Sequence, residues 1–190
     1  MKLILVRHGE TDVNASNLTH KTGVSVGLNE KGKILISETT EVVRQHSPQK
    51  VYCSPEKRCI ESAQIISNTL NLKFEITDEL GERNWGDWEG RSWDEIKPVL
   101  DKMALEERYT FIPPKGESWK QMEERIKRFL QKLEKENLKS VCVVTHAGTL
   151  RGMMPILKRE PKESSFKYEF QNASVTVFEF ENGRYNEIQI

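Results

Sequence analysis

The sequence has few cysteines, no excess charge of either sign and no long apolar run, and each absence excludes a class of protein. Its three cysteines, Cys53, Cys59 and Cys142, are odd in number and form no Cys-x-x-Cys pair, which argues against a disulfide framework or a zinc site. The 29 acidic and 29 basic residues cancel, so a broad basic surface for nucleic acid is not expected. No stretch approaches transmembrane length, and Arg7 and His8 interrupt the first apolar run too early for a signal peptide. We therefore expect a cytoplasmic protein that binds neither nucleic acid nor membrane.

Length and apolar pattern indicate an α/β protein. The 190 residues suffice for a sizeable core, so we expect residues 1–190 to form a single domain. Strands are expected over residues 2–7, 51–53, 73–76, 140–145, 174–180 and 184–190, the last two joined at Asn182-Gly183 as a hairpin. Helices are expected over residues 30–46, from a Ser54 cap to about 70, 92–108 with a break or kink at Pro98, 118–135, and 148–158. This alternation predicts a mostly parallel sheet between helices.

Two of the expected strands end in histidine followed closely by glycine. The first ends at Arg7-His8-Gly9, and a β-branched run from residue 141 ends at Thr145-His146-Ala147-Gly148. Because ligands bind at the carboxyl ends of parallel strands, we expect both imidazoles to face one crevice. Arg58 falls in the first turn of the intervening helix, near a terminus suited to anions. Two histidines and two arginines suit a phosphoryl group, and they would not hold a metal ion because arginine repels cations.

These segments resemble the histidine phosphatase superfamily, also called the phosphoglycerate mutase-like family. The matching segments, in chain order, are Leu5-Val6-Arg7-His8-Gly9-Glu10-Thr11, Ser54-Pro55 with Arg58 and Glu61-Ser62-Ala63, Leu80 with Glu82, Gly86-Asp87-Trp88-Glu89-Gly90, Gly116-Glu117-Ser118 and Thr145-His146-Ala147-Gly148. The resemblance spans nearly the whole chain. It implies a three-layer αβα sandwich whose mostly parallel sheet has one antiparallel edge strand.

The resemblance also implies roles for individual residues. His8 would become phosphorylated, Arg7, Arg58 and His146 would hold the phosphoryl oxygens, and Glu82 would donate the proton to the leaving group. The chemistry requires such groups, because phosphoryl transfer depends on positioning and on stabilising charge spread over three oxygens.

The remaining assignments concern substrate binding. By the resemblance, Asn14 and Thr11 would contact the substrate, and Gly9 and Gly148 would let the backbone approach the anion closely. Trp85 and Trp88, beside Glu82, are the tryptophans most suited to line a pocket, whereas Trp93 and Trp119 are expected to pack internally. His20 and His46 match no motif and are expected in solvent.

The sequence predicts a small phosphorylated metabolite as the partner, with no cofactor and no metal. Among possible substrates are α-ribazole phosphate, a sugar phosphate or bisphosphate, 3-phosphoglycerate and phosphohistidine on a protein. The loop at residues 19–27 lacks the family's usual aromatic residue, and Leu35-Ile36 replaces its Gln-Ala. Because that loop often contacts substrate, the sequence does not choose among these. It does not indicate an oligomeric state either.

Three functions remain open at this level. A phosphatase is favoured over a cofactor-dependent phosphoglycerate mutase, because mutases are usually longer and carry an Arg-Arg pair and Glu-Arg-His-Tyr-Gly at the acid. This chain reads Glu82-Arg83-Asn84-Trp85-Gly86 and contains no Arg-Arg pair. The third alternative is a non-catalytic phosphate-binding domain, but members that lose catalysis usually lack a core residue, and all are present here.

Overall fold

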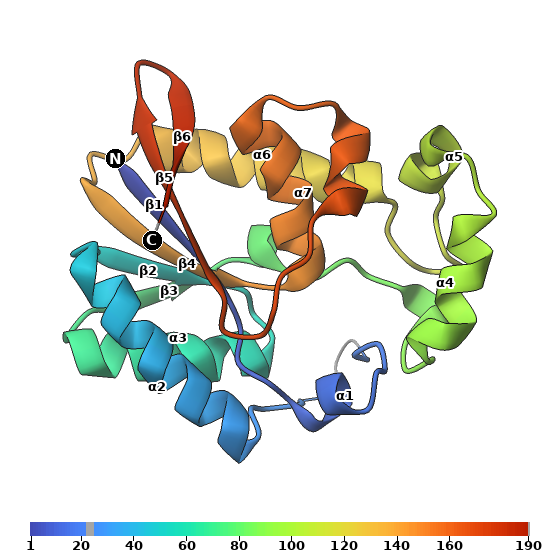
Figure 1. Ribbon diagram of the computed structural model, residues 1–190, viewed down its shortest axis with the longest axis horizontal. Coiled ribbons are helices and arrows are strands. Elements are labelled where there is room, and N and C mark those ends of the chain that lie inside the picture. The colour runs from blue at the N-terminus through green and yellow to red at the C-terminus, as the bar shows by residue number, and fades with distance from the viewer. Residues whose placement is uncertain (22–24, 190) are drawn as a thin grey trace.

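The computed structural model describes residues 1–21 and 25–189, and in this part of the chain six strands form one sheet (Figure 1). The strands are β1 (Lys2–Arg7), β2 (Lys50–Cys53), β3 (Phe74–Ile76), β4 (Ser140–Thr145), β5 (Val175–Glu181) and β6 (Arg184–Ile188), in the order β3-β2-β4-β1-β5-β6. β1 to β4 pair in parallel, whereas β5 pairs antiparallel with both β1 and β6. The mostly parallel sheet with antiparallel pairing at one edge is therefore confirmed. Asn182 and Gly183, both with positive φ, form the expected hairpin turn.

Helices cover both faces of the sheet. They are α1 (Asp12–Ala15), α2 (Glu30–Gln45), α3 (Lys57–Leu70), α4 (Trp93–Asp101), α5 (Leu105–Thr110), α6 (Trp119–Glu134) and α7 (Ala147–Lys158), with 3₁₀-helices at Asp78–Leu80, Gly86–Trp88 and Lys162–Lys167. The expected capping box of Ser118 and Gln121 at the start of α6 is present. The helices expected near residues 30–46, 118–135 and 148–158 are thus confirmed within one or two residues.

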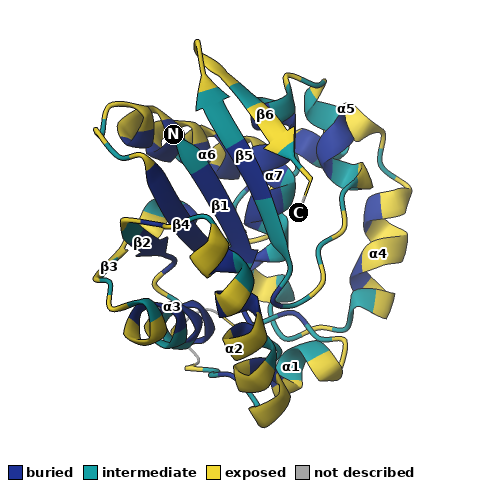
Figure 2. Cartoon of the chain, turned by 60° about the vertical axis from the view of Figure 1, so that its left-hand side comes forward, coloured by how far each residue is buried: buried dark blue, intermediate teal, exposed yellow. Residues whose placement is uncertain are grey.

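Alternate side chains of each strand enter the two cores. On β1, Leu3 and Leu5 pack into the core formed with α6 and α7, whereas Ile4 and Val6 pack into the core formed with α2 and α3. Figure 2 shows the central strands buried and the outer faces of α2 and α4 exposed. The three-layer αβα sandwich is therefore confirmed, and burial on both sides explains why the central strands read as continuous apolar runs.

Two helix boundaries differ from the prediction. Helix α3 begins at Lys57 rather than at Pro55, with Glu56 at its N-cap, because the Ser54 side chain instead contacts Glu56 and His146. The helix expected over residues 92–108 is two helices separated at residues 102–104, and Pro98 lies inside the first. Proline is tolerated there because Asp94, whose carbonyl loses its helical donor, lies at the exposed surface where water can replace the bond.

α4 packs on a small apolar cluster beside the main sandwich. The cluster contains Trp85, Ile96 and Leu100, with Trp93 and Phe111 packed against it. It fixes the loop that follows Glu82 and so forms one side of the cavity described below. Within residues 1–21 and 25–189, no helix has the length and apolar character needed to cross a membrane.

Candidate active site

The strand register brings the two histidines together. Arg7 on β1 lies opposite Thr145 on β4, so the next residues, His8 and His146, leave the sheet side by side. Their ring centroids are 5.1 Å apart, and both side chains are buried. The carboxyl ends of β1, β2 and β4 thus form the floor of one site, as expected for an open α/β sheet.

The hydrogen bond at one nitrogen of His8 defines the state of the other. Nδ1 lies 2.7 Å from the carbonyl oxygen of Gly9, which can only accept, so Nδ1 carries the proton and Nε2 keeps its lone pair. Burial holds the pKa of His8 well below its usual value, and the neighbouring His146, Arg58 and Arg7 lower it further. His8 is therefore a neutral imidazole with a free Nε2 at neutral pH.

Neither Arg7 nor Arg58 forms an ion pair with a carboxylate among residues 1–21 and 25–189. Arg7 Nη1 donates to the carbonyl oxygen of Phe170 at 2.6 Å, and Arg58 Nη2 donates to His146 Nδ1 at 3.0 Å. The Nε atoms of both arginines are buried and have no hydrogen-bond partner in the described part of the chain. Buried cations and unused N–H donors are stabilised by an anion, so this pair is suited to bind one.

His146 is held between Arg58 and Glu56. Because its Nδ1 accepts from Arg58, its Nε2 carries the proton and faces Glu56 Oε2 at 3.0 Å and Ser54 Oγ at 2.6 Å. Burial lowers the pKa of His146, and the charge of Arg58 lowers it further. For Glu56, burial raises the pKa, but the hydrogen bonds from His146 and Ser54 outweigh it and hold the pKa below the usual range. Glu56 is therefore a carboxylate behind a neutral His146.

Glu82 is fixed by backbone donors. Its Oε2 accepts from the N–H of Gly148 at 3.1 Å and its Oε1 from the N–H of Arg83 at 2.9 Å. A Cβ atom on Gly148 would lie 2.2 Å from Glu82 Oε1. Gly148 thus leaves room for the carboxyl group of Glu82 and also lines the cavity, and its close approach to a bound anion stays a prediction.

Hydrogen bonds from one strand, β4, and two helices, α6 and α7, hold the loop that carries Glu82. Thr145 Oγ1 donates to the carbonyl of Leu80 at 2.6 Å, and Thr149 Oγ1 donates to that of Gly81 at 2.7 Å. Arg125 of α6 donates to the carbonyl of Glu82 at 3.1 Å and forms a bidentate ion pair with Glu117 at 2.9 and 3.0 Å. The Glu117 motif therefore positions the Glu82 loop.

Of the two substrate-binding residues expected in the first motif, Asn14 lines the cavity and Thr11 does not. Asn14 lines the cavity, and its Oδ1 contacts the N–H and Oγ1 of Thr11 and Nδ2 of Asn172, which leaves Asn14 Nδ2 as the donor on the cavity side. Thr11 is fully buried and caps α1, so it orients Asn14 and does not line the cavity. Gly9 faces α2, since its Cβ would lie 2.5 Å from the carbonyl oxygen of Gly32. The expectation that Gly9 approaches the anion is therefore wrong.

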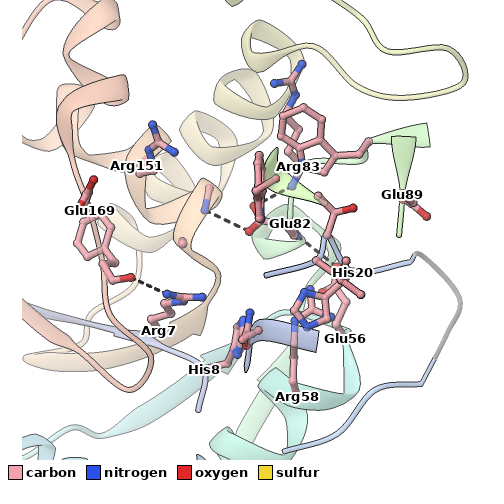
Figure 3. A pocket seen from close by; sticks show the side chains of 18 of the residues that line it. Arg7, His8, His20, Glu56, Arg58, Glu82, Arg83, Glu89, Arg151 and Glu169 are labelled. Carbon is pink, nitrogen blue, oxygen red and sulfur yellow. Dashed lines mark hydrogen bonds between the residues drawn. The ribbon is translucent and has the colours of Figure 1, made fainter. Parts of the chain in front are cut away.

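These side chains surround a cavity of about 340 Å³ (Figure 3). Trp85, Trp93 and Trp119 line it, whereas Trp88 does not, because Trp88 packs on Phe111 and stacks on Trp85. The preference for Trp88 over Trp93 and Trp119 was therefore wrong. The 340 Å³ cavity is of a size that suits a small metabolite.

Sequence reasoning missed several lining residues. His20, expected in solvent, lies 5.9 Å from His8 between ring centroids, and its Nε2 is 3.0 Å from Thr11 Oγ1. Burial, together with nearby Arg58, His146 and Arg7, lowers the pKa of His20 to about 3. Glu56 was also missed, although its place two residues before Arg58, after a strand end, was a usable signal.

The segment between α7 and β5 supplies the rest of the wall. Tyr168, Glu169, Phe170 and Gln171 line the cavity. Asn172 Nδ2 donates to the carbonyl oxygens of His8 and Gly9 at 3.2 and 3.3 Å. No pattern in the sequence connects this segment with a turn more than 160 residues earlier.

In the described residues, no three histidine, cysteine, aspartate or glutamate side chains gather as they would around a metal ion. The cavity floor instead presents two guanidinium groups, one neutral imidazole with a free lone pair and one imidazole backed by a carboxylate. This set can bind a phosphoryl group and attack it.

Comparison with known proteins agrees with this geometry. The family model described as the histidine phosphatase superfamily (branch 1) matches residues 3–189. The chain belongs to this superfamily. It is 28% identical over 173 residues to an adenosylcobalamin/alpha-ribazole phosphatase of Salmonella typhimurium, covering 88% of this chain and 85% of that protein. It is 29% identical over 187 residues to a 2,3-bisphosphoglycerate-dependent phosphoglycerate mutase of Cytophaga hutchinsonii, covering 94% and 87%.

Solved structures share the fold. The alpha-ribazole phosphatase from Shigella flexneri superimposes with a TM-score of 0.87 at 23% identity, over 99% of this chain and 95% of that one. The relatives thus include phosphatases and mutases, both of which act on small phosphorylated substrates.

Proposed function

We propose that the protein is a phosphoric monoester hydrolase of the histidine acid phosphatase type, with residues 1–190 as one catalytic domain. It hydrolyses small phosphomonoesters through a phosphohistidine on His8. The observation that carries this proposal is the free Nε2 of a neutral, buried His8 beside Arg7 and Arg58, whose unused N–H donors suit phosphoryl oxygens. No cofactor or metal is required, because the arginines supply the positive charge.

In the first step, His8 Nε2 attacks phosphorus and the bond from phosphorus to the ester oxygen breaks. The leaving oxygen takes the electron pair and a proton from the carboxyl group of Glu82. Arg7, Arg58 and the amide of Asn14 stabilise the charge on the three equatorial oxygens. The product is an alcohol and a phosphohistidine.

In the second step, water replaces the alcohol. The Glu82 carboxylate takes a proton from water as the water oxygen attacks phosphorus, the P–N bond breaks and its electron pair returns to Nε2. Inorganic phosphate leaves, and both His8 and Glu82 regain their initial states.

His146 can bind the phosphoryl group as a donor only if its protonation state changes. It accepts from Arg58 at Nδ1, so it can donate to a phosphoryl oxygen only after Nδ1 takes up a proton. The Glu56 carboxylate at Nε2 and the dianionic phosphoryl group both favour that imidazolium. We therefore assign Glu56 as the residue that positions and charges His146.

A phosphoglycerate mutase is the second candidate, supported by the 29% identity to the Cytophaga protein. A mutase uses the same phosphohistidine but returns the phosphoryl group to another hydroxyl group. The chain lacks the Arg-Arg pair and the Glu-Arg-His-Tyr-Gly segment of mutases, which favours hydrolysis. A non-catalytic phosphate-binding domain is disfavoured because His8, Glu82 and both arginines are all present at one cavity.

The proposal is tested by trapping the intermediate. Wild-type protein is mixed with phosphorus-labelled p-nitrophenyl phosphate and quenched in alkali, and the labelled peptide is identified by mass spectrometry. We expect acid-labile phosphate on residue 8, and a His8→Asn variant should lose label and at least about 10³-fold in turnover. His46→Asn, a histidine outside the cavity, is the matched control and keeps both.

Two further measurements distinguish a phosphatase from a mutase and from a non-catalytic domain. Turnover should survive EDTA and be inhibited by vanadate, which imitates five-coordinate phosphorus. Rapid interconversion of 3- and 2-phosphoglycerate after addition of 2,3-bisphosphoglycerate would establish the mutase. Label on another residue would overturn the assignment of His8. If no ester is turned over, the protein is a non-catalytic phosphate-binding domain.

A further inference from the structure

Two arginines that the proposed mechanism does not use lie in the wall of the same cavity. Arg83 and Arg151 both line it, and Arg83 is only 3% exposed. Their guanidinium carbons lie 6.0 and 5.6 Å from the ring centroid of Trp119, which also lines the cavity. Figure 3 shows Arg83 and Arg151 on the far side of Glu82 from His8. The cavity thus has a second cationic group beyond the residues that hold phosphate.

Both guanidinium groups are fixed by neutral acceptors. Arg83 donates from Nε and Nη2 to the carbonyl oxygens of Glu117 and Phe111 at 2.9 and 3.0 Å. Arg151 donates from Nε and Nη2 to those of Ser165 and Phe166, both at 3.2 Å. In each case Nη1 donates no hydrogen bond within the described part of the chain. The two side chains are therefore held in place while one nitrogen of each stays available.

The charge of both arginines is left without a paired carboxylate. Neither forms an ion pair within residues 1–21 and 25–189, although Glu82 and Glu117 exert a longer-range attraction on Arg83, and Glu82 and Glu169 on Arg151. Arg125 provides the contrast, because it has a bidentate carboxylate partner in Glu117. Arg83 is buried and Arg151 half-buried, and aromatic faces stand beside their charges, with the Trp85 ring centroid 4.3 Å from the guanidinium carbon of Arg83. A cation in such a wall is stabilised further by an anion.

Trp119 adds an independent observation. Its indole Nε1 is buried and has no hydrogen-bond acceptor in the described part of the chain. Buried donors are nearly always satisfied in folded proteins, and an exception calls for a ligand or a water. Trp119 lies near both guanidinium groups and lines the same cavity, so its unpaired indole donor belongs to the same part of the wall.

We propose that Arg83, Trp119 and Arg151 bind a second anionic group of the substrate, a carboxylate or a second phosphate. This inference rests on the proposed function and narrows it. The ester phosphate lies at His8, the scissile oxygen lies at Glu82, and the far end of the leaving group carries a negative charge. The substrate class is then a small phosphomonoester with an anion at the other end, and esters with a neutral leaving group are poor substrates.

The test compares esters that differ only at the far end. The series contains ω-hydroxyalkyl phosphates of three to six carbons and their counterparts that end in a carboxylate or a second phosphate. At the best chain length, we expect kcat/KM to be about 10- to 100-fold higher for an anionic member than for the neutral one, as hydrogen bonds to charged groups allow. Whether the carboxylate or the phosphate member gives the larger ratio identifies the anion.

Variants of the cavity wall show which residues cause the preference for anionic esters. In Arg151→Gln the ratio between anionic and neutral members should fall to within about threefold of one, and in Trp119→Phe, which removes only the indole donor, it should fall by about three- to tenfold. Arg44→Gln, an exposed arginine on α2, is the matched control and should keep the wild-type ratio. Thermal unfolding of each variant checks the fold, and Trp119→Phe alone decides if Arg151→Gln does not fold.

The outcomes that contradict the subsite differ from those that contradict the proposed function. Hydrolysis of neutral and anionic esters with equal kcat/KM at every chain length overturns the subsite and leaves the phosphatase intact. An anion preference that persists in both variants also overturns it. No hydrolysis of any ester overturns the proposed function and the subsite with it.

Discussion

At the scale of single residues, the two acidic side chains of the site, Glu56 and Glu82, differ in the groups that donate hydrogen bonds to them. Glu56 also lines the cavity, but it receives hydrogen bonds from His146 and Ser54, which commit it as a carboxylate. Glu82 is oriented by backbone N–H groups of Gly148 and Arg83 and lines the cavity itself. In the proposed mechanism, Glu82 is the acid that exchanges a proton with the substrate.

The role of Glu82 predicts a dependence on the leaving group. In Glu82→Gln, kcat/KM for alkyl phosphates should fall by about 10²–10⁴, because an alkoxide needs a proton to depart. Loss on p-nitrophenyl phosphate should be much smaller, since its phenolate departs with little help. Steady-state kinetics on both esters measures the difference.

Controls for this prediction are nearby carboxyl groups. Asp87 pairs with Lys115 at 3.1 Å and does not line the cavity, so Asp87→Asn should leave the comparison unchanged. An equal loss on both esters in Glu82→Gln would show that Glu82 binds or supports structure. A selective loss in Asp87→Asn or Glu89→Gln would transfer the proton donor to that residue.

The sequence predicted the residues next to strand ends better than those brought from elsewhere. His8, Arg7 and His146 follow or end parallel strands, so topology alone places them at one edge. His20 reaches the cavity and Asn172 reaches the His8 turn through loops whose course no periodic pattern encodes. Their positions depend on tertiary contacts, which a local reading of the sequence does not include.

At the scale of elements, α2 crosses the His8 turn with almost no gap. A Cβ on Gly32 would lie 2.2 Å from the carbonyl oxygen and 2.6 Å from the nitrogen of Glu10. Asn29, the N-cap of α2, also hydrogen-bonds its N–H to the Glu10 carbonyl at 3.0 Å. The start of this helix thus fixes the path of the chain just after His8, the proposed nucleophile.

We predict that Gly32→Ala destabilises the protein and lowers its activity. In an open helix this change should stabilise by up to about 1 kcal/mol, because alanine has the better helix propensity. Here the added methyl group must displace backbone, so we expect a net loss of about 1–3 kcal/mol in the free energy of unfolding. Urea unfolding and kcat on p-nitrophenyl phosphate measure both effects.

The comparison variant is Ser37→Ala on the exposed face of α2, which should change neither quantity appreciably. A Gly32→Ala protein as stable and as active as the wild type would show that the helix can move away from the turn without consequence.

The differences between predicted and observed elements have local physical causes. The cap expected at Ser54 moved to Glu56 because His146 and Glu56 compete for the serine hydroxyl group. The helix over 92–108 divided at residues 102–104 and not at Pro98, since Asp94, whose carbonyl loses its donor to Pro98, is exposed to water. Sequence rules weigh each residue alone and do not include such competition.

At the scale of the whole molecule, the buried histidines couple stability to pH. In the folded state the pKa values of His8, His20 and His146 all lie below the usual value, with burial as the largest cause. The unfolded chain therefore binds more protons than the folded one as the pH falls below about 6.5. Acid favours unfolding, although His8 itself stays neutral in the folded state.

We predict that the free energy of unfolding decreases between about pH 7 and about pH 5, with a slope of at most about 1.4 kcal/mol per pH unit for each fully buried histidine. For His20 the window runs from about 6.5 down to about 3, and solvent screening reduces its share because it is only partly buried. Glu56, whose pKa is lowered, adds loss in the same direction at lower pH.

Urea unfolding across this range measures the slope. A His20→Asn variant removes one titrating group, so its slope should be shallower than that of the wild type. Stability that stays constant or rises as the pH falls to about 5 would contradict the buried, neutral state of these histidines.

The tie between Asn172 and the carbonyl of His8 joins two ends of the chain that the ribosome makes at very different times. The same is true of β1, where Leu3 lies opposite Val141 on one side and Phe178 on the other. A nascent chain that still lacks these partners has neither a supported nucleophile nor a paired first strand. His8, the proposed nucleophile, therefore gains these supporting contacts only after β4, Asn172 and β5 have been synthesised.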